Sequence, residues 1–107
     1  MALQKMIGTR FTVASPAGES GKWLQNFPHA THKLKGTFIC ILEGSGTNPP
    51  ILNIRGGAWG TYGTNFTPTT TSTIFHAQLT EDTQIILVGA GAGTGTTKVT
   101  FIKAGEL

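Results

Sequence analysis

The chain has 107 residues and a mass of 11.3 kDa, which suits one domain and leaves no room for a catalytic domain with an accessory one. Glycine occurs 15 times, threonine is more frequent still, and charged residues make up only 12%. Threonine suits a half-buried pleated surface and glycine suits turns, so the composition favours an all-β fold. A hydrophobic content of 38% argues against disorder.

The charge balance is mildly basic, with a net charge of +3 and a pI near 9.4. The basic residues are scattered, and only Lys33 and Lys35 lie close together, so we expect no nucleic-acid partner. A basic balance equally suits an acidic protein surface. The first residues lack the apolar core of a signal peptide, and no apolar run reaches the length of a membrane span. We therefore expect a soluble chain made in the cytoplasm, with no membrane partner.

Residues 1–8 have weak periodicity and end at a glycine, which predicts an N-terminal arm ahead of a single domain over residues 9–107. The arm contains Leu3, Met6 and Ile7, whose apolar side chains gain when a partner covers them. We expect these three side chains to contact a partner protein.

The first half of the domain predicts several short strands. Residues 10–14 alternate polar and apolar, and residues 36–43 form the firmest strand of the chain. Residues 51–55 are predicted to return beside 36–43 as a hairpin. The glycine-rich residues 58–63 are interpreted as a bulged strand.

The second half continues the pattern. Residues 71–79 alternate between polar and apolar faces, which places His76 on the outer face. Residues 83–88 are predicted to form a second buried strand. A connection at 89–95 leads to a last strand at 97–103. Seven or eight short strands predict an antiparallel β-sandwich, jelly-roll-like. The predicted core is Phe38, Cys40, Leu42, Leu52, Ile54, Phe75, Leu79, Ile86, Val88, Val99 and Phe101.

Two glycine-rich segments resemble nucleotide-binding loops, but neither has the residue spacing that such a loop requires. In residues 89–95 the third glycine of the dinucleotide fingerprint is misplaced, and the residues that follow alternate as a strand where a helix is required. Residues 18–23 lack the Walker spacing. We expect no cofactor.

Catalytic and metal-binding groupings are also missing from the sequence. His29 and His32 lie close together, but no cysteine or carboxylate accompanies them, and His76 is distant. Cys40 is interpreted as a small buried hydrophobe. The five carboxylates lie mostly in turns or at strand ends, and no nucleophile elbow occurs. We expect no metal, no catalytic residue and no enzyme activity.

Two aromatic residues leave an alternative open. Trp59 and Tyr62 are three positions apart in a glycine-rich stretch and form a platform for stacking a sugar ring if both are exposed. For Trp59 the competing interpretation is packing in the core, which we favour.

Several segments together carry a resemblance, namely 21–24, 34–38, 50–54 with Trp59 after it, 83–91 and 97–101. They comprise a Gly-Thr-Phe strand, a second strand with an aliphatic face, a tryptophan, and a late strand joined by a Gly/Thr loop to the final one. This pattern resembles small β-sandwich virion proteins of tailed bacteriophages, including capsid decoration or cement proteins.

The resemblance implies a structural role on the exterior of a virion. The expected function is to decorate and stabilise a capsid by bridging neighbouring major capsid protein subunits, as a homotrimer, with the arm and the loops at 44–50 and 89–95 adapting to the shell. The alternative is a carbohydrate- or receptor-binding module of a phage tail or fibre. Only this alternative predicts a glycan ligand, bound at Trp59 and Tyr62.

Overall fold

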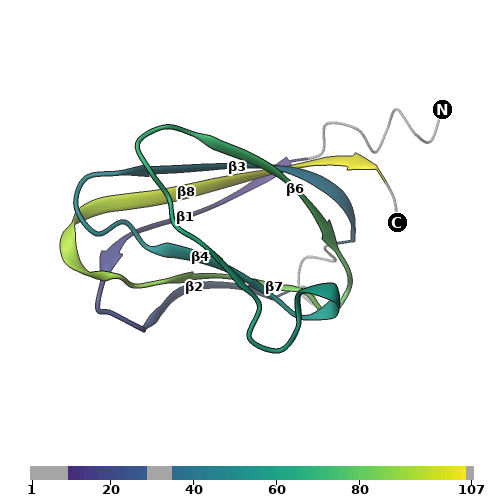
Figure 1. Ribbon diagram of the computed structural model, residues 1–107, viewed down its shortest axis with the longest axis horizontal. Helices are drawn as coiled ribbons and strands as arrows, with labels where there is room; N and C mark the ends of the chain where they lie inside the picture. Colours follow the sequence, from purple (N-terminus) through teal and green to yellow (C-terminus); the bar gives the residue numbers. More distant parts are fainter. Residues whose placement is uncertain (1–9, 29–34, 106–107) are drawn as a thin grey trace.

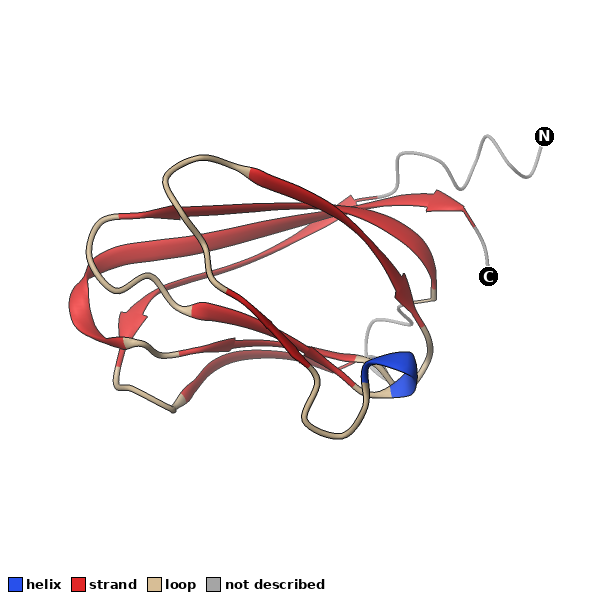
Figure 2. Ribbon diagram, viewed as in Figure 1, coloured by secondary structure: helices blue, strands red, loops and turns tan. Residues whose placement is uncertain are grey.

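The structure is a computed structural model of the chain and describes residues 10–28 and 35–105. Strands make up nearly all its regular structure, and a short 3₁₀ turn, η1, lies at one end of the molecule (Figure 2). The elements are β1 (Arg10–Gly18), β2 (Trp23–Pro28), β3 (Gly36–Ser45), β4 (Ile51–Arg55), η1 (Gly57–Trp59), β5 (Thr64–Phe66), β6 (Thr73–Leu79), β7 (Gln84–Val88) and β8 (Gly91–Gly105).

Eight strands form two antiparallel sheets that face each other (Figure 1). One sheet has the order β1-β8-β3-β6 and the other the order β2-β7-β4-β5. The chain changes sheet at every connection except the one between β4 and β5. The predicted antiparallel β-sandwich is therefore confirmed.

The core lies between the sheets and follows the period of two expected of strands. Phe11 of β1 stacks on Phe101 of β8 and on Phe27 of β2, with ring centroids 4.8 Å apart in both pairs. This stack joins the two sheets at one end of the core. The buried core residues are Val13, Phe38, Cys40, Leu42, Leu52, Ile54, Ala77, Leu79, Ile85, Leu87, Val99 and Phe101, with Phe75 packed against them.

The predicted inward face of β7 is wrong. Ile85 and Leu87 point into the core, whereas Ile86 is buried on the outer side of its sheet and Val88 is half-buried there. The sequence gives no alternation here because this strand is apolar on both faces. Something outside the sheet must therefore cover Ile86.

The predicted hairpin between residues 36–43 and 51–55 is also wrong. β3 pairs with β6 and β8, and β4 pairs with β5 and β7, so the two strands belong to opposite sheets. Hydrogen bonds to β8 hold the connection between them, including one of 2.6 Å from the Thr97 hydroxyl to the Pro50 carbonyl. Strand β8 begins at Gly91, so much of the predicted loop 89–95 is strand.

Residues 58–63 form part of η1 and a loop in place of the predicted bulged strand. Gly56 and Gly57 have positive φ values, which turn the chain away from β4. The Asp82 carboxylate accepts a 2.9 Å hydrogen bond from the Gly57 amide and so fixes the turn against the β6–β7 connection. This arrangement determines where Trp59 and Tyr62 lie.

Candidate functional site

The single cysteine does not provide a nucleophile. Cys40 is fully buried, and burial raises the pKa of its thiol to about 12. At neutral pH the thiol is therefore protonated and inaccessible, as a core side chain is.

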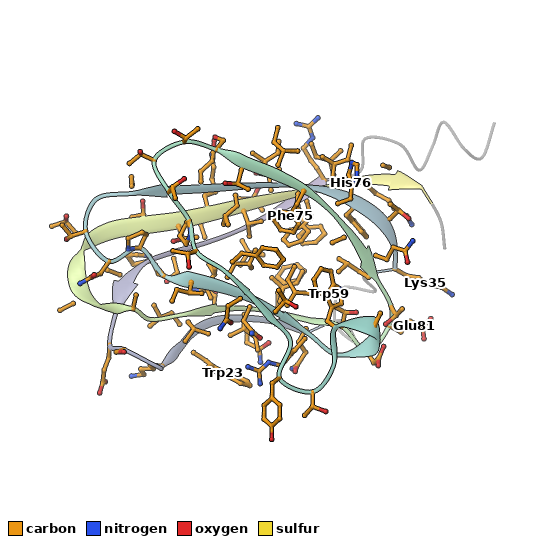
Figure 3. The ribbon with its side chains drawn as sticks, viewed as in Figure 1. Trp23, Lys35, Trp59, Phe75, His76 and Glu81 are labelled. Atoms are coloured by element: carbon orange, nitrogen blue, oxygen red, sulfur yellow. The ribbon has the colours of Figure 1, made fainter. Side chains whose placement is uncertain are left out.

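Three carboxylates of the described residues, Glu43, Glu81 and Asp82, have structural partners. Glu43 pairs with Lys98 at 3.3 Å, and Glu81 pairs with Lys35 at 3.9 Å near the end of the molecule that carries η1 (Figure 3). Asp82 holds the η1 turn. Glu43 and Glu81 each face a lysine and Asp82 accepts from a backbone amide, so these three carboxylates make structural contacts.

The histidines give no metal-binding geometry in the described ranges. His76 is exposed on the outer face of β6, as predicted (Figure 3). Over residues 10–28 and 35–105, no three His, Cys, Asp or Glu side chains gather closely enough to hold a metal ion. His29 and His32 lie outside the described residues.

The two aromatic residues of the predicted sugar platform have different environments. Trp59 is partly buried and packs against the core, where its ring meets Phe66 edge-on and its indole N–H donates a 3.0 Å hydrogen bond to the Gln78 carbonyl. The side chain of Tyr62 is 84% exposed. Core packing is thus the interpretation of Trp59 that the structure supports, and Trp59 does not offer an open ring beside Tyr62.

A different tryptophan lies on the outside of the sandwich. Trp23 is 47% exposed and lies beyond the β2-β7-β4-β5 sheet, whereas Trp59 and Phe75 lie between the sheets (Figure 3). The Arg55 guanidinium carbon lies 4.8 Å from the centre of the Trp23 ring, a cation–π contact.

This contact crosses over β7. Trp23 is in register with Val88 on one side of β7, and Arg55 is in register with Gln84 on the other side. A contact between them must therefore run diagonally over Ile86, the outward residue between Gln84 and Val88. The strand register thus places the Trp23–Arg55 pair across Ile86, which is fully buried although it lies on an outer face.

A buried amide holds Arg55 in place. Asn53, only 3% exposed, accepts a 2.8 Å hydrogen bond from Arg55 Nε at its Oδ1. Its Nδ2 donates to Asn65 Oδ1 at 2.8 Å and to the Tyr62 carbonyl at 3.1 Å, which ties the Tyr62 loop to β4. We call this outer surface the tryptophan face; it comprises Trp23, Asn26, Asn53, Arg55, Asn65 and Ile86, with Tyr62 at its β5 side.

The opposite outer face carries a group of isoleucines among polar side chains. Strand register places Ile41 between Ile74 and Thr100, and Ile39 between His76 and Ile102. Ile74 is 66% exposed and lies on β6, an edge strand of its sheet. The four isoleucines, Ile39, Ile41, Ile74 and Ile102, are called the isoleucine face.

Sequence reasoning missed both outer faces. Leu3, Met6 and Ile7, the predicted contact residues, lie outside the described residues. Ile74 was identifiable from its place opposite Phe75 in an alternating strand. Trp23 and Arg55 are far apart in the chain and come together only through their common neighbour β7.

Comparisons with protein-family models, with curated proteins and with solved structures found no match for this chain. No helix within the described residues is long and apolar enough to cross a membrane.

Proposed function

We propose that the protein is a non-catalytic structural module that decorates and stabilises a bacteriophage capsid by bridging neighbouring coat subunits. The observation that carries the proposal is the isoleucine face, where Ile74 is 66% exposed beside three half-buried isoleucines. The exposed side chain of Ile74 continues into the half-buried ones, and a docking partner that covers this strip gains apolar burial.

The position of Ile74 suggests how a coat subunit attaches. Strand β6 is an edge strand, so an extended coat-protein segment can add beside it through backbone hydrogen bonds. Outward side chains of the added segment would then lie beside Ile74, whose neighbour on the next strand is Ile41. Many such contacts on one shell act together, so weak single contacts suffice.

Two further observations support a virion role. The strand orders β1-β8-β3-β6 and β2-β7-β4-β5 are those expected of an eight-stranded jelly roll, an arrangement used by viral capsid domains. The net charge of +3 suits docking on an acidic shell. The resemblance to decoration proteins points the same way and adds the proposal of a homotrimer, which analytical ultracentrifugation tests.

The test of attachment is co-sedimentation of the purified chain with empty capsids assembled from the coat protein of its source phage. Ile74→Glu places a charge on the isoleucine face without disturbing the core, since this side chain is 66% exposed. We expect the affinity for capsids to fall about tenfold, which corresponds to about 1.4 kcal/mol.

The matched control is Tyr62→Glu, which adds the same charge at an 84% exposed position on the other side of the sandwich. It should bind capsids as the unmodified chain does. Slow reaction of the Cys40 thiol with a thiol reagent verifies that each variant keeps its core closed. Undiminished occupancy of Ile74→Glu, or an equal loss with Tyr62→Glu, would show that the isoleucine face is not the attachment surface.

A further inference from the structure

The tryptophan face has the features of a ligand-binding surface that capsid attachment does not use. Trp23 and Tyr62 expose aromatic rings to solvent. Within the described residues, the indole N–H of Trp23 and the two terminal NH₂ groups of Arg55 have no hydrogen-bond or ion-pair partner. The tryptophan face therefore combines exposed aromatic rings with hydrogen-bond donors that a ligand can use.

The donors are fixed before any ligand arrives. Asn53 holds Arg55 Nε at 2.8 Å, and the contact with Trp23 holds the guanidinium plane over β7. A side chain already held in its binding orientation loses little conformational entropy when a ligand is bound. Gly63 lets the Tyr62 loop lie close, since its φ is +72° and a Cβ there would meet the Ile54 carbonyl and the Arg55 side chain.

The charge of this face favours an anionic ligand. Arg55 carries the one charge among the residues of β2, β4, β5 and β7. The free edge of a guanidinium offers parallel N–H groups that match the two oxygens of a carboxylate. Around it the face presents neutral amides, Asn26 and Asn65, which are exposed in one row across the sheet with Ile86 and Asn53.

We propose that the tryptophan face binds an oligosaccharide that carries a carboxylate, such as a uronic or sialic acid residue. The carboxylate pairs with the terminal NH₂ groups of Arg55. The apolar C–H face of a pyranose ring packs on the exposed surface of Trp23, and Asn26 and Asn65 exchange hydrogen bonds with hydroxyl groups. Tyr62 supplies a second aromatic surface at the β5 side.

Single-stranded nucleic acid also stacks on aromatic side chains and is the main competing ligand. It needs several cations along its backbone, because neutralisation of phosphates supplies most of its affinity. With one cation in four strands, this face lacks such a track. The amides and the single guanidinium fit a saccharide with isolated carboxylates better.

The experiment is an NMR titration of the isotope-labelled full chain with trigalacturonate and with sialyllactose, and with α-1,4-galactotriose and lactose as their neutral counterparts. We expect at least one acidic probe to shift the indole N–H signal of Trp23. The Trp59 indole is an internal reference, because it is bonded to the Gln78 carbonyl and packed against the core. The neutral counterparts should bind about tenfold more weakly.

Variants separate the roles of the residues. Trp23→Ala and Arg55→Gln should each weaken binding of the acidic probe at least tenfold, and Arg55→Lys should weaken it because a lysine lacks the forked donors. Lys98→Gln is the matched control for Arg55→Gln, since it removes one exposed charge from the opposite sheet. Ile74→Ala is the control for Trp23→Ala, and both controls should bind normally.

Three results would overturn the proposal. The first is that neither acidic probe shifts the Trp23 signal at millimolar concentration. The second is binding that survives both Trp23→Ala and Arg55→Gln. The third is tighter binding of a short oligothymidine than of either acidic sugar, which would assign the face to nucleic acid.

Discussion

The two outer faces of the sandwich differ in how their apolar side chains are covered. On the tryptophan face, Ile86 is fully buried, and the contact between Trp23 and Arg55 crosses above it. On the isoleucine face, Ile74 remains 66% exposed. One face thus covers its aliphatic residue with polar and aromatic side chains, and the other leaves Ile74 open to solvent beside three half-buried isoleucines.

The largest expected effect on stability follows from this difference. Ile86→Ala should lower the free energy of unfolding by about 2–4 kcal/mol, as for other buried isoleucines. Ile74→Ala removes a mostly exposed side chain and should change it by less than about 0.5 kcal/mol. Urea unfolding followed by circular dichroism measures both. Similar losses in the two variants would mean that the faces are not covered differently.

The next effect concerns the amide that supports the tryptophan face. Asn53→Ala leaves Arg55 Nε, Asn65 and the Tyr62 carbonyl without their shared partner, which should cost about 1–3 kcal/mol. Asn26→Ala, at an exposed position in the same row, should cost less than about 0.5 kcal/mol. If urea unfolding gives equal losses of unfolding free energy for Asn53→Ala and Asn26→Ala, the hydrogen bonds of Asn53 do not stabilise this face.

Loss of the cover itself should have a smaller effect. Trp23→Ala removes the cation–π contact and part of the shield over Ile86, and we expect a loss of about 1 kcal/mol. Combined with Ile86→Ala, the two changes should be less than additive, because each removes part of the same contact. Strict additivity in the double-mutant cycle would show that residues other than Trp23 cover Ile86.

The smallest effect is expected from the ion pair beside the isoleucine face. Lys98 and Glu43 lie 3.3 Å apart with side chains 56% and 42% exposed, so solvent screens most of their attraction. Lys98→Gln should change the melting temperature by no more than about 2 °C, and added salt should abolish the difference. A large and salt-resistant loss would show that this pair has a greater structural role.

The sequence predicted those parts of the fold that depend on local alternation. Strands β3 and β6 show which side chains face inward, and Phe38, Cys40, Leu42 and Leu79 are in the core as expected. Strand β7 is apolar on both faces, so its inward residues could not be chosen. The hairpin prediction failed because strand partners in a two-sheet fold depend on contacts distant in sequence.

The same limit applies to the candidate sites. The exposed position of Ile74 follows from simple alternation in β6. The Trp23–Arg55 contact needs the knowledge that β2 and β4 both flank β7, and no spacing in the sequence gives it. The glycines around Trp59 suggested an open aromatic platform, yet they form the turn beside which its ring packs against the core.

Under the two proposals, the outer faces act independently, one in protein docking and the other in saccharide binding. The most direct measurement is the affinity of the acidic oligosaccharide for the chain when it is free and when it is bound to capsids, by isothermal titration calorimetry. We predict equal affinities, because the isoleucine and tryptophan faces lie on opposite sheets. Displacement of the chain from capsids by the sugar, or loss of sugar binding on capsids, would contradict the account.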